Sequence, residues 1–208
     1  MNIVLVGPPA SGKGTQAKML AEKYDLVHIS TGELLRNIVT QKGKLADEIR
    51  SLIEKGNFVC DELITQLLKE HLMSIDKKNG VLLDGYPRTL EQAKALEEFL
   101  KLDFVFELKL SEQSLVNRIL DRYSCSKCGK SYIMSLHKSE ICSDCGSKLM
   151  KRADDTEEIA HKRYAEYIEK TYPIVEFYKN LKGFYQLNAE QSIKTVFIEI
   201  CKIIESEL

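Results

Sequence analysis

The feature that most constrains the fold is a glycine-rich turn, GPPASGKGTQ, that joins an apolar run to a helical pattern. The apolar run is IVLV at residues 3–6, and it predicts a short buried strand. The turn occupies residues 7–16, after which Ala17, Leu20 and Tyr24 share one face of a helix. Strand, glycine-rich turn, lysine and helix form the context of a phosphate-binding loop, where backbone N–H groups and a helix N-terminus surround an anion.

Within this turn, Lys13 can reach the outer phosphates of a nucleotide, and we expect it to lie on a surface loop. The general pattern continues with a Ser or Thr that meets Mg²⁺, but here Gly14 follows and Thr15 comes one place later. Two alternatives are an ordinary strand-to-helix turn and a dinucleotide-binding turn made by GKGTQA. The second starts too far from the strand, because its glycines would fall inside the helix.

Strand-like and helix-like segments alternate along the rest of the chain. Four further strands are predicted at residues 27–30, 81–84, 104–108 and 184–187. Helices are predicted from Asp61 as an N-cap, over about 90–100, from Ser111, and from about Thr156 with a kink or break at Pro173. This alternation predicts a P-loop α/β fold of three layers, in which helices cover both faces of a five-stranded parallel sheet.

Length and composition limit the possible classes of protein. The 208 residues fit one domain with insertions, and a net charge of −1 argues against a general nucleic-acid or membrane surface. No apolar run reaches transmembrane length, and the first strand leaves no room for a leader peptide. We therefore expect a cytoplasmic protein, in which the six cysteines do not form disulfides. Cys60 and Cys201 belong to no motif and are expected to be buried.

The carboxyl ends of the first three strands carry polar motifs, and in a parallel sheet these ends meet at one edge. Asp84 ends the third strand and is the predicted holder of Mg²⁺, directly or through water, with an N-cap role as the alternative. Arg36 and Arg88 follow the second and third strands and would reach the same edge. Arginine suits phosphoryl transfer, because its planar guanidinium stays charged and binds two oxygens at once.

Five motifs together make the sequence resemble the adenylate kinases, in their long bacterial form with a cysteine-bearing lid, over nearly the whole chain. The motifs are GPPASGKGTQ at 7–16, ISTGELLR at 29–36, LLDGYPRT at 82–89, RILDR at 118–122 and RADDTEE at 152–158. The resemblance implies reversible phosphoryl transfer from MgATP to AMP, giving two ADP. Alternatives are a GTP:AMP kinase or a kinase for another nucleoside monophosphate.

The resemblance also implies roles for individual residues. The ATP site would comprise Ala10, Ser11, Gly12, Lys13, Gly14, Thr15, Arg118, Ser131, Tyr132 and Gln191. The AMP site would comprise Thr31, Arg36, Asn57, Phe58, Val59, Gly85, Tyr86, Pro87, Arg88, Gln92, Arg152 and Arg163. The catalytic residues would be Lys13, Asp84, Arg88, Arg122, Arg152 and Arg163. The chain departs from relatives at Ala10 and Ala189, where glycine is usual, and at Tyr123, where a second arginine is common.

The same resemblance divides the chain into three parts. The core would comprise residues 1–29, 60–120 and 156–208, a helical AMP-binding insertion 30–59, and a lid 121–155. No histidine or carboxylate base stands out among the motifs, and none is needed, because the phosphate of AMP is itself mostly dianionic at neutral pH. Catalysis would then rest on positioning and charge neutralisation, with lid closure to exclude water. We expect a monomer.

Four cysteines form two paired knuckles, each followed by glycine. Cys125 and Cys128 make the first pair, and Cys142 and Cys145 the second, a spacing that suits one structural Zn²⁺ bound by four thiolates. Reduced cysteines without metal and an iron–sulfur cluster are the alternatives. A rival function would make the knuckles a nucleic-acid-binding module. Residues 121–155 contain seven Lys or Arg, five Asp or Glu and few aromatic side chains, so the sequence gives that function little support.

Overall fold

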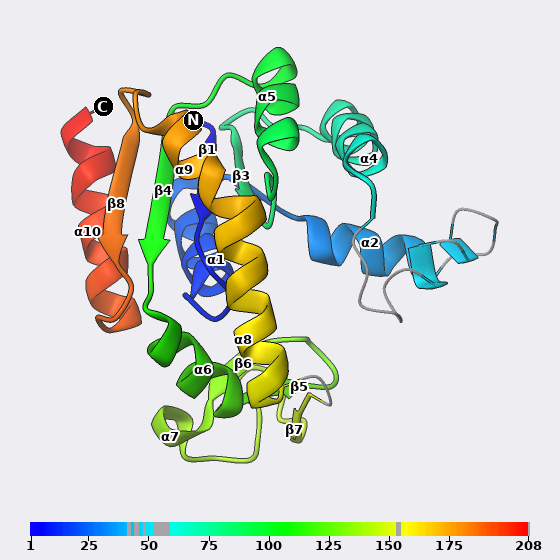
Figure 1. Cartoon of the computed structure of the whole chain (residues 1–208), viewed down its shortest axis with the longest axis vertical. Helices are drawn as coiled ribbons and strands as arrows, with labels where there is room; N and C mark the ends of the chain where they lie inside the picture. The colour runs from blue at the N-terminus through cyan, green and yellow to red at the C-terminus, as the bar shows by residue number, and fades with distance from the viewer. Residues whose placement is uncertain (41–42, 44–45, 48, 52–58, 153–154, 208) are drawn as a thin grey trace.

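The structure, a computed structural model, describes residues 1–40, 43, 46–47, 49–51, 59–152 and 155–207. Its centre is a parallel sheet of five strands in the order β2-β3-β1-β4-β8 (Figure 1). The strands are β1 Ile3–Val6, β2 Val27–Ser30, β3 Val81–Asp84, β4 Phe104–Lys109 and β8 Phe184–Asn188. All five predicted strands are confirmed, each within two residues of its predicted ends.

Helices cover both faces of this sheet and so complete the three layers. The longer helices of the described chain are α1 Lys13–Tyr24, α2 Thr31–Val39, α4 Asp61–Ser74, α5 Leu90–Phe99, α6 Glu112–Leu120, α8 Glu157–Glu166, α9 Tyr172–Tyr178 and α10 Ile193–Glu207. Of these, α1 and α10 cover one face of the sheet, and α4, α5 and α9 cover the other. Alternate residues of β1 pack against the helices on the two faces of the sheet. Ile3 and Leu5 pack with α1 and α10, whereas Val4 and Val6 pack with α4, α5 and α9. The all-apolar strand is thus explained by burial on both sides.

The register of the sheet brings three strand ends beside the glycine-rich loop. Leu5 pairs with Asp84 of β3, and Val6 pairs with Glu107 of β4. Ser30 of β2 pairs with Asp84 in turn. The motifs that follow β1, β2 and β3 therefore meet at one edge of the sheet, as the sequence predicts.

The long helical stretch after Thr156 is interrupted before Pro173. A π-helical turn, η1 Tyr167–Thr171, joins α8 to α9. The N–H of Tyr172 bonds to the carbonyl of Tyr167, five residues back instead of four. Pro173 has no N–H with which to continue the α-helical hydrogen bonds, and we attribute the π-helical turn before it to this missing donor.

A second, smaller sheet contains the cysteine knuckles. Three antiparallel strands stand in the order β6-β5-β7, with α7 Met134–His137 beside them. Their bounds are β5 Arg122–Cys125, β6 Ser131–Ile133 and β7 Leu149–Lys151. Cys125, Tyr132, Cys142 and Leu149 form its small core. Figure 1 shows this unit at one end of the molecule, next to α6 and α8, while α2 extends from the central sheet in another direction.

Two expectations about α4 are wrong. Asp61 is the first residue of the helix rather than its N-cap, which is Cys60. Cys60 is exposed, because it lies at the helix start and not under it, whereas Cys201 is buried as predicted.

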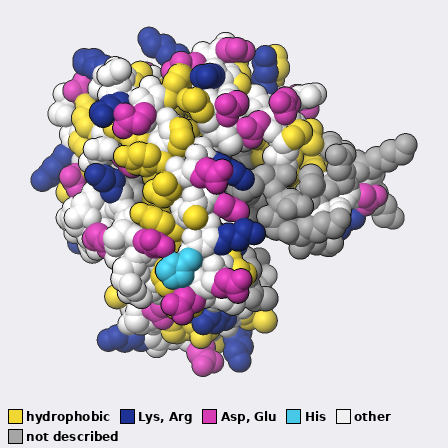
Figure 2. Space-filling view, viewed as in Figure 1, with side chains coloured by type: hydrophobic (Ala, Val, Ile, Leu, Met, Phe, Trp, Pro, Cys, Tyr) yellow, Lys and Arg dark blue, Asp and Glu magenta, His cyan; other side chains and the backbone are white. Residues whose placement is uncertain are grey.

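Figure 2 shows acidic and basic side chains interspersed over one face of the molecule, in keeping with the net charge of −1. Among the described helices, none combines the length and the apolar character that crossing a bilayer would require.

Candidate active site

The glycine-rich loop folds around its own lysine. Gly12 is the N-cap of α1 with φ of 93°, and Lys13 is the first residue of the helix. Lys13 Nζ reaches back to donate to the carbonyl oxygens of Gly7 at 2.6 Å and Pro8 at 2.8 Å. Lys13 is therefore a half-buried residue of α1, and not part of a surface loop as expected, because its ammonium turns back toward the loop carbonyls. Burial lowers the pKa of this ammonium to about 8, against the opposing attraction of Asp84.

Two loop positions explain the need for small or unusual residues. A Cβ on Gly7 would lie 2.6 Å from the carbonyl oxygen of Leu108, so any side chain there would force β1 and β4 apart. Ala10 has φ of 58°, in the left-handed region. That conformation costs an alanine about 1 kcal/mol more than a glycine.

Asp84 closes the other side of the loop. Its Oδ2 lies 3.9 Å from His28 Nε2, and a Cβ on Gly14 would lie 3.3 Å from the same oxygen. Burial would raise the pKa of Asp84, but the neighbouring His28, Lys13 and Arg88 outweigh burial and lower it. Among the described residues, its carboxylate accepts no hydrogen bond from the backbone that follows, which disfavours the N-cap alternative. An ionised oxygen beside a phosphate loop fits Mg²⁺, which prefers oxygen ligands.

One buried carboxylate organises two of the predicted arginines. Asp155 has a fully buried side chain and accepts from Arg122, with Nε at 2.9 Å from Oδ2 and Nη2 at 2.5 Å from Oδ1. Arg163 Nη1 lies 3.4 Å from the same Oδ1. Because a carboxylate has lone pairs for both partners, Asp155 holds the two guanidinium groups side by side. This role was not predicted, although the adjacent acids of RADDTEE mark the segment as one that could pair arginines.

Arg152 is anchored within the small sheet. Its Nε donates to Ser124 Oγ at 2.9 Å and its Nη2 to Ser131 Oγ at 3.3 Å. Tyr132 has its side chain turned inward, with its hydroxyl 3.2 Å from Cys142 Sγ and 3.1 Å from Ser143 Oγ. A contact of Tyr132 with nucleotide would therefore have to use its backbone.

The segment after β3 is tied together by short hydrogen bonds. Thr31 Oγ1 donates to the Gly85 carbonyl at 2.9 Å, and Arg88 Nε donates to the same oxygen at 2.8 Å. Gly85 has φ of 80°, in the left-handed region that favours glycine, and a Cβ there would lie 3.0 Å from Arg88 Nη2. Gln92 Oε1 accepts from the Arg88 N–H at 2.7 Å. Tyr86 is only 1% exposed and packs into the core, with its hydroxyl 2.8 Å from Thr65 Oγ1.

One cavity of about 730 Å³ joins these groups. Of the residues predicted from the sequence, its lining includes Lys13, Val59, Asp84, Gly85, Pro87, Arg88, Gln92, Arg122, Arg152 and Arg163. Sequence reasoning missed the lining residues Asp61, Glu166, Tyr167, Lys170 and Thr171. Most of these come from the end of α8 and from η1, whose inward-facing side the sequence does not reveal. Asn57 and Phe58 lie outside the described residues, as does the side chain of Arg36.

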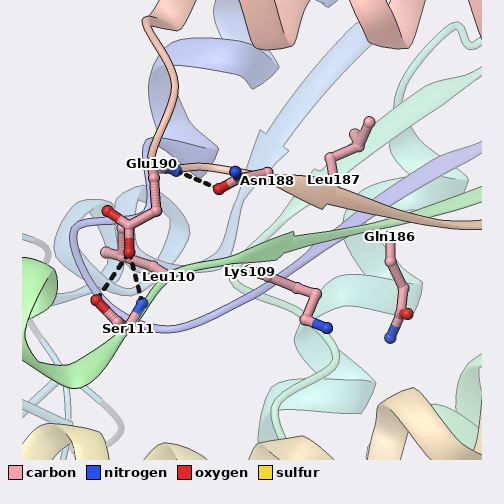
Figure 3. A pocket seen from close by; sticks show the side chains of 7 residues that line it. All are labelled: Lys109, Leu110, Ser111, Gln186, Leu187, Asn188 and Glu190. Carbon is pink, nitrogen blue, oxygen red and sulfur yellow. Dashed lines mark hydrogen bonds between the residues drawn. The ribbon is translucent and has the colours of Figure 1, made fainter.

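The predicted adenine side of ATP lies away from this cavity. Arg118 of α6 donates from Nη1 to the Ala10 carbonyl at 3.3 Å and from Nη2 to the Ala189 carbonyl at 2.7 Å. A second hollow of about 570 Å³ lies at the ends of β4 and β8, next to Gln191 in the chain. In Figure 3, the Glu190 carboxylate there points to Ser111, from whose N–H and hydroxyl it accepts at 3.0 and 2.8 Å.

The four cysteine side chains converge within the small sheet. The Sγ atoms of Cys125, Cys128, Cys142 and Cys145 all lie within 4.8 Å of one another. Four thiolates at such distances fit a tetrahedral Zn²⁺ site, in which the sulfurs would lie about 3.8 Å apart around bonds of ~2.3 Å. The predicted grouping of the two knuckles is confirmed.

A phosphate loop that faces a cavity lined by arginines is the arrangement of an enzyme that transfers phosphoryl groups. The sequence model of the family described as "Adenylate kinase" matches residues 5–183. An adenylate kinase from Fervidobacterium nodosum is 44% identical over 204 residues, covering 94% of both chains. One from Clostridium tetani is 41% identical over 98% of both chains, and one from Rickettsia conorii is 39% identical over 99% of both.

The chain therefore belongs to the adenylate kinase family. This membership confirms the activity expected from the sequence, which is phosphoryl transfer from ATP to AMP with ADP as the product.

Proposed function

We propose that the 730 Å³ cavity is where the two nucleotides meet, with ATP phosphates on the side of the glycine-rich loop and AMP on the side of Arg88 and Gln92. The observation that carries this assignment is the charge of the lining. Three acidic side chains, Asp61, Asp84 and Glu166, are outnumbered there by six cationic ones: Lys13, Arg88, Arg122, Arg152, Arg163 and Lys170. Each can neutralise phosphate charge that would otherwise oppose the approach of two polyanions.

The chemistry proposed for this cavity needs no protein base. An oxygen of the AMP phosphate attacks the γ-phosphorus of ATP, the new P–O bond forms, and the bond to the β-phosphate oxygen breaks to release ADP. The dianionic AMP phosphate carries no proton that must be removed. Lys13 would stabilise the negative charge that develops between the β- and γ-phosphates. Arg88, together with the two arginines held by Asp155, would bind the transferred phosphoryl group.

Substrate binding would use the remaining predicted residues. On the ATP side, the N–H groups from Ala10 to Thr15 would surround the phosphates, and Arg118 would stack on the adenine. Ser131, Tyr132 and Gln191 would contact ATP, with Tyr132 doing so through its backbone. On the AMP side, we assign Thr31, Arg36, Asn57, Phe58, Val59, Gly85, Tyr86, Pro87, Arg88 and Gln92, with Thr31 and Gln92 beside the adenine base. The side chain of Tyr86 is buried, so Tyr86 would contribute by packing behind the residues that line the AMP side of the cavity.

The metals have separate proposed places. Mg²⁺ would be held at Asp84, directly or through water, where it would neutralise phosphate charge. Zn²⁺ would be held by the four cysteines, and a full shell of thiolates would leave no position for substrate or water, so its role is structural. We further propose that residues 121–155 act as a lid over the core, and that residues 30–59 form the AMP-binding part.

Lys13→Met tests the assignment of the loop. Because Lys13 meets phosphate charge that is greatest during transfer, this substitution should lower kcat by at least about a thousandfold. Lys18→Met, on the exposed side of the same helix, is the matched control and should leave kcat within about twofold of wild type. A folded Lys13→Met enzyme, checked by circular dichroism, that retains near-normal kcat would rule out the proposed phosphate site.

A further inference from the structure

Asp61 links the start of α4 to the segment that follows β3. Its Oδ1 accepts from Gln92 Nε2 at 2.7 Å, and its Oδ2 accepts from Thr89 Oγ1 at 2.5 Å. Thr89 is the N-cap of α5 and accepts from the Gln92 N–H at 3.2 Å. Asp61 also lines the 730 Å³ cavity together with Thr89 and Gln92. The carboxylate thus lies beside the site and contacts the side chain assigned to the AMP base.

These contacts give the Gln92 amide one orientation. Gln92 is 5% exposed, and its Oε1 accepts from the Arg88 backbone N–H at 2.7 Å. A backbone N–H can only donate, and an ionised carboxylate can only accept. Turning the amide over would place its NH₂ against the Arg88 N–H and its oxygen against the Asp61 carboxylate. Both contacts would then be repulsive, so each partner opposes the reversed orientation.

A fixed amide leaves a fixed pattern for a ligand. Gln92 retains one hydrogen on Nε2 and one lone pair on Oε1, and its side chain lines the cavity. The Watson–Crick edge of adenine presents an acceptor at N1 and a donor at the 6-amino group. Hypoxanthine and guanine present a donor at N1 and an acceptor at O6, so the same two positions are reversed. An amide that could turn over would satisfy either pattern, whereas an amide held in one orientation satisfies one.

We propose that Asp61 is a positioning residue that fixes the orientation of Gln92 and thereby makes the acceptor site select a 6-aminopurine over a 6-oxopurine. This inference rests on the proposed function, in which Gln92 contacts the AMP base. The selectivity would come from unpaired buried polar groups in the complex with the wrong base.

The test compares AMP with IMP as acceptors at saturating MgATP, for Asp61→Asn, Gln92→Ala, the double variant and a control. Asp61→Asn keeps the size of the side chain but can donate to a reversed amide. Glu62→Gln, an exposed neighbour in the same first turn of α4, removes an equal charge from the helix N-terminus without contacting Gln92. The readout is the ratio of kcat/KM for AMP to that for IMP, in which any loss of folded enzyme cancels.

Asp61→Asn is expected to lower the AMP:IMP ratio about tenfold, as one of the two constraints on the amide is lost. Glu62→Gln should keep the wild-type ratio. In the Gln92→Ala background, Asp61→Asn should change the ratio no further, since its effect passes through the amide. A ratio unchanged by Asp61→Asn, or lowered equally without Gln92, would overturn the inference. If Gln92→Ala itself left the ratio and the KM for AMP unchanged, the assignment of Gln92 would fail instead.

Discussion

Asp155→Asn should destabilise the protein by about 2–4 kcal/mol, because it removes the charge that two arginines share. Two unit charges about 4 Å apart interact by about 4 kcal/mol at an effective dielectric constant of 20. Breaking a buried ion pair costs about 3–5 kcal/mol. The Arg122 and Arg163 side chains are 13% and 27% exposed, so water recovers part of that loss. The Asn amide also turns an NH₂ donor toward guanidinium groups that cannot accept.

Thermal unfolding followed by circular dichroism measures this effect. For a chain of this size, a loss of 2–4 kcal/mol corresponds to a Tm lower by roughly 5–12 °C. Asp144→Asn is the matched control, because Asp144 pairs with Lys130 at 2.5 Å on the surface, where such pairs contribute about 0–1 kcal/mol. Activity should also fall at least about tenfold in Asp155→Asn, since two phosphate-binding groups lose their orientation. An Asp155→Asn variant that melts within about 2 °C of wild type would refute the reasoning.

Two further predictions concern pH and metal. The folded-state pKa of Lys13 is about 8, against 10.5 when unfolded, so the unfolded chain binds more protons between these pH values. Stability measured by urea titration should therefore gain about 2–3 kcal/mol from Lys13 as pH rises from 8 to 10.5, a gain that Lys13→Met should lack. Protein purified without chelator should contain about one zinc per chain by elemental analysis. Strong chelation, or the double substitution Cys142→Ser and Cys145→Ser, should lower hydrogen-exchange protection more in the small sheet than in the central sheet. An unchanged Tm after complete removal of zinc would contradict the structural role.

The central sheet could be predicted because its signals are local. The strands β1, β3 and β4 are largely apolar runs that are buried along most of their length, which leaves little ambiguity. Ile3–Val6 and Val81–Asp84 have the predicted bounds. The glycine-rich loop was predictable for the same reason, since strand, turn and helix are adjacent in the chain. The small antiparallel sheet was not, because strands of three or four residues are too short to show alternation.

The parts of the site that could not be predicted depend on contacts between distant segments. Asp61 is 31 positions from Gln92 and Asp155 is 33 from Arg122, and no local pattern reveals either hydrogen bond. The half-buried position of Lys13 depends on how its side chain turns back over the loop. The inward direction of the Tyr132 side chain likewise depends on its contact with Cys142, which belongs to the second cysteine pair.

The most direct test of the proposed site is an acceptor scan at saturating MgATP, with ADP formation measured for AMP, UMP, CMP and GMP. A site in which Gln92 offers both a donor and an acceptor to the base should reject a base that leaves them unpaired. We expect kcat/KM for AMP to exceed that for each of the others by at least about a hundredfold. A value for UMP comparable to that for AMP would contradict the assignment of the AMP site.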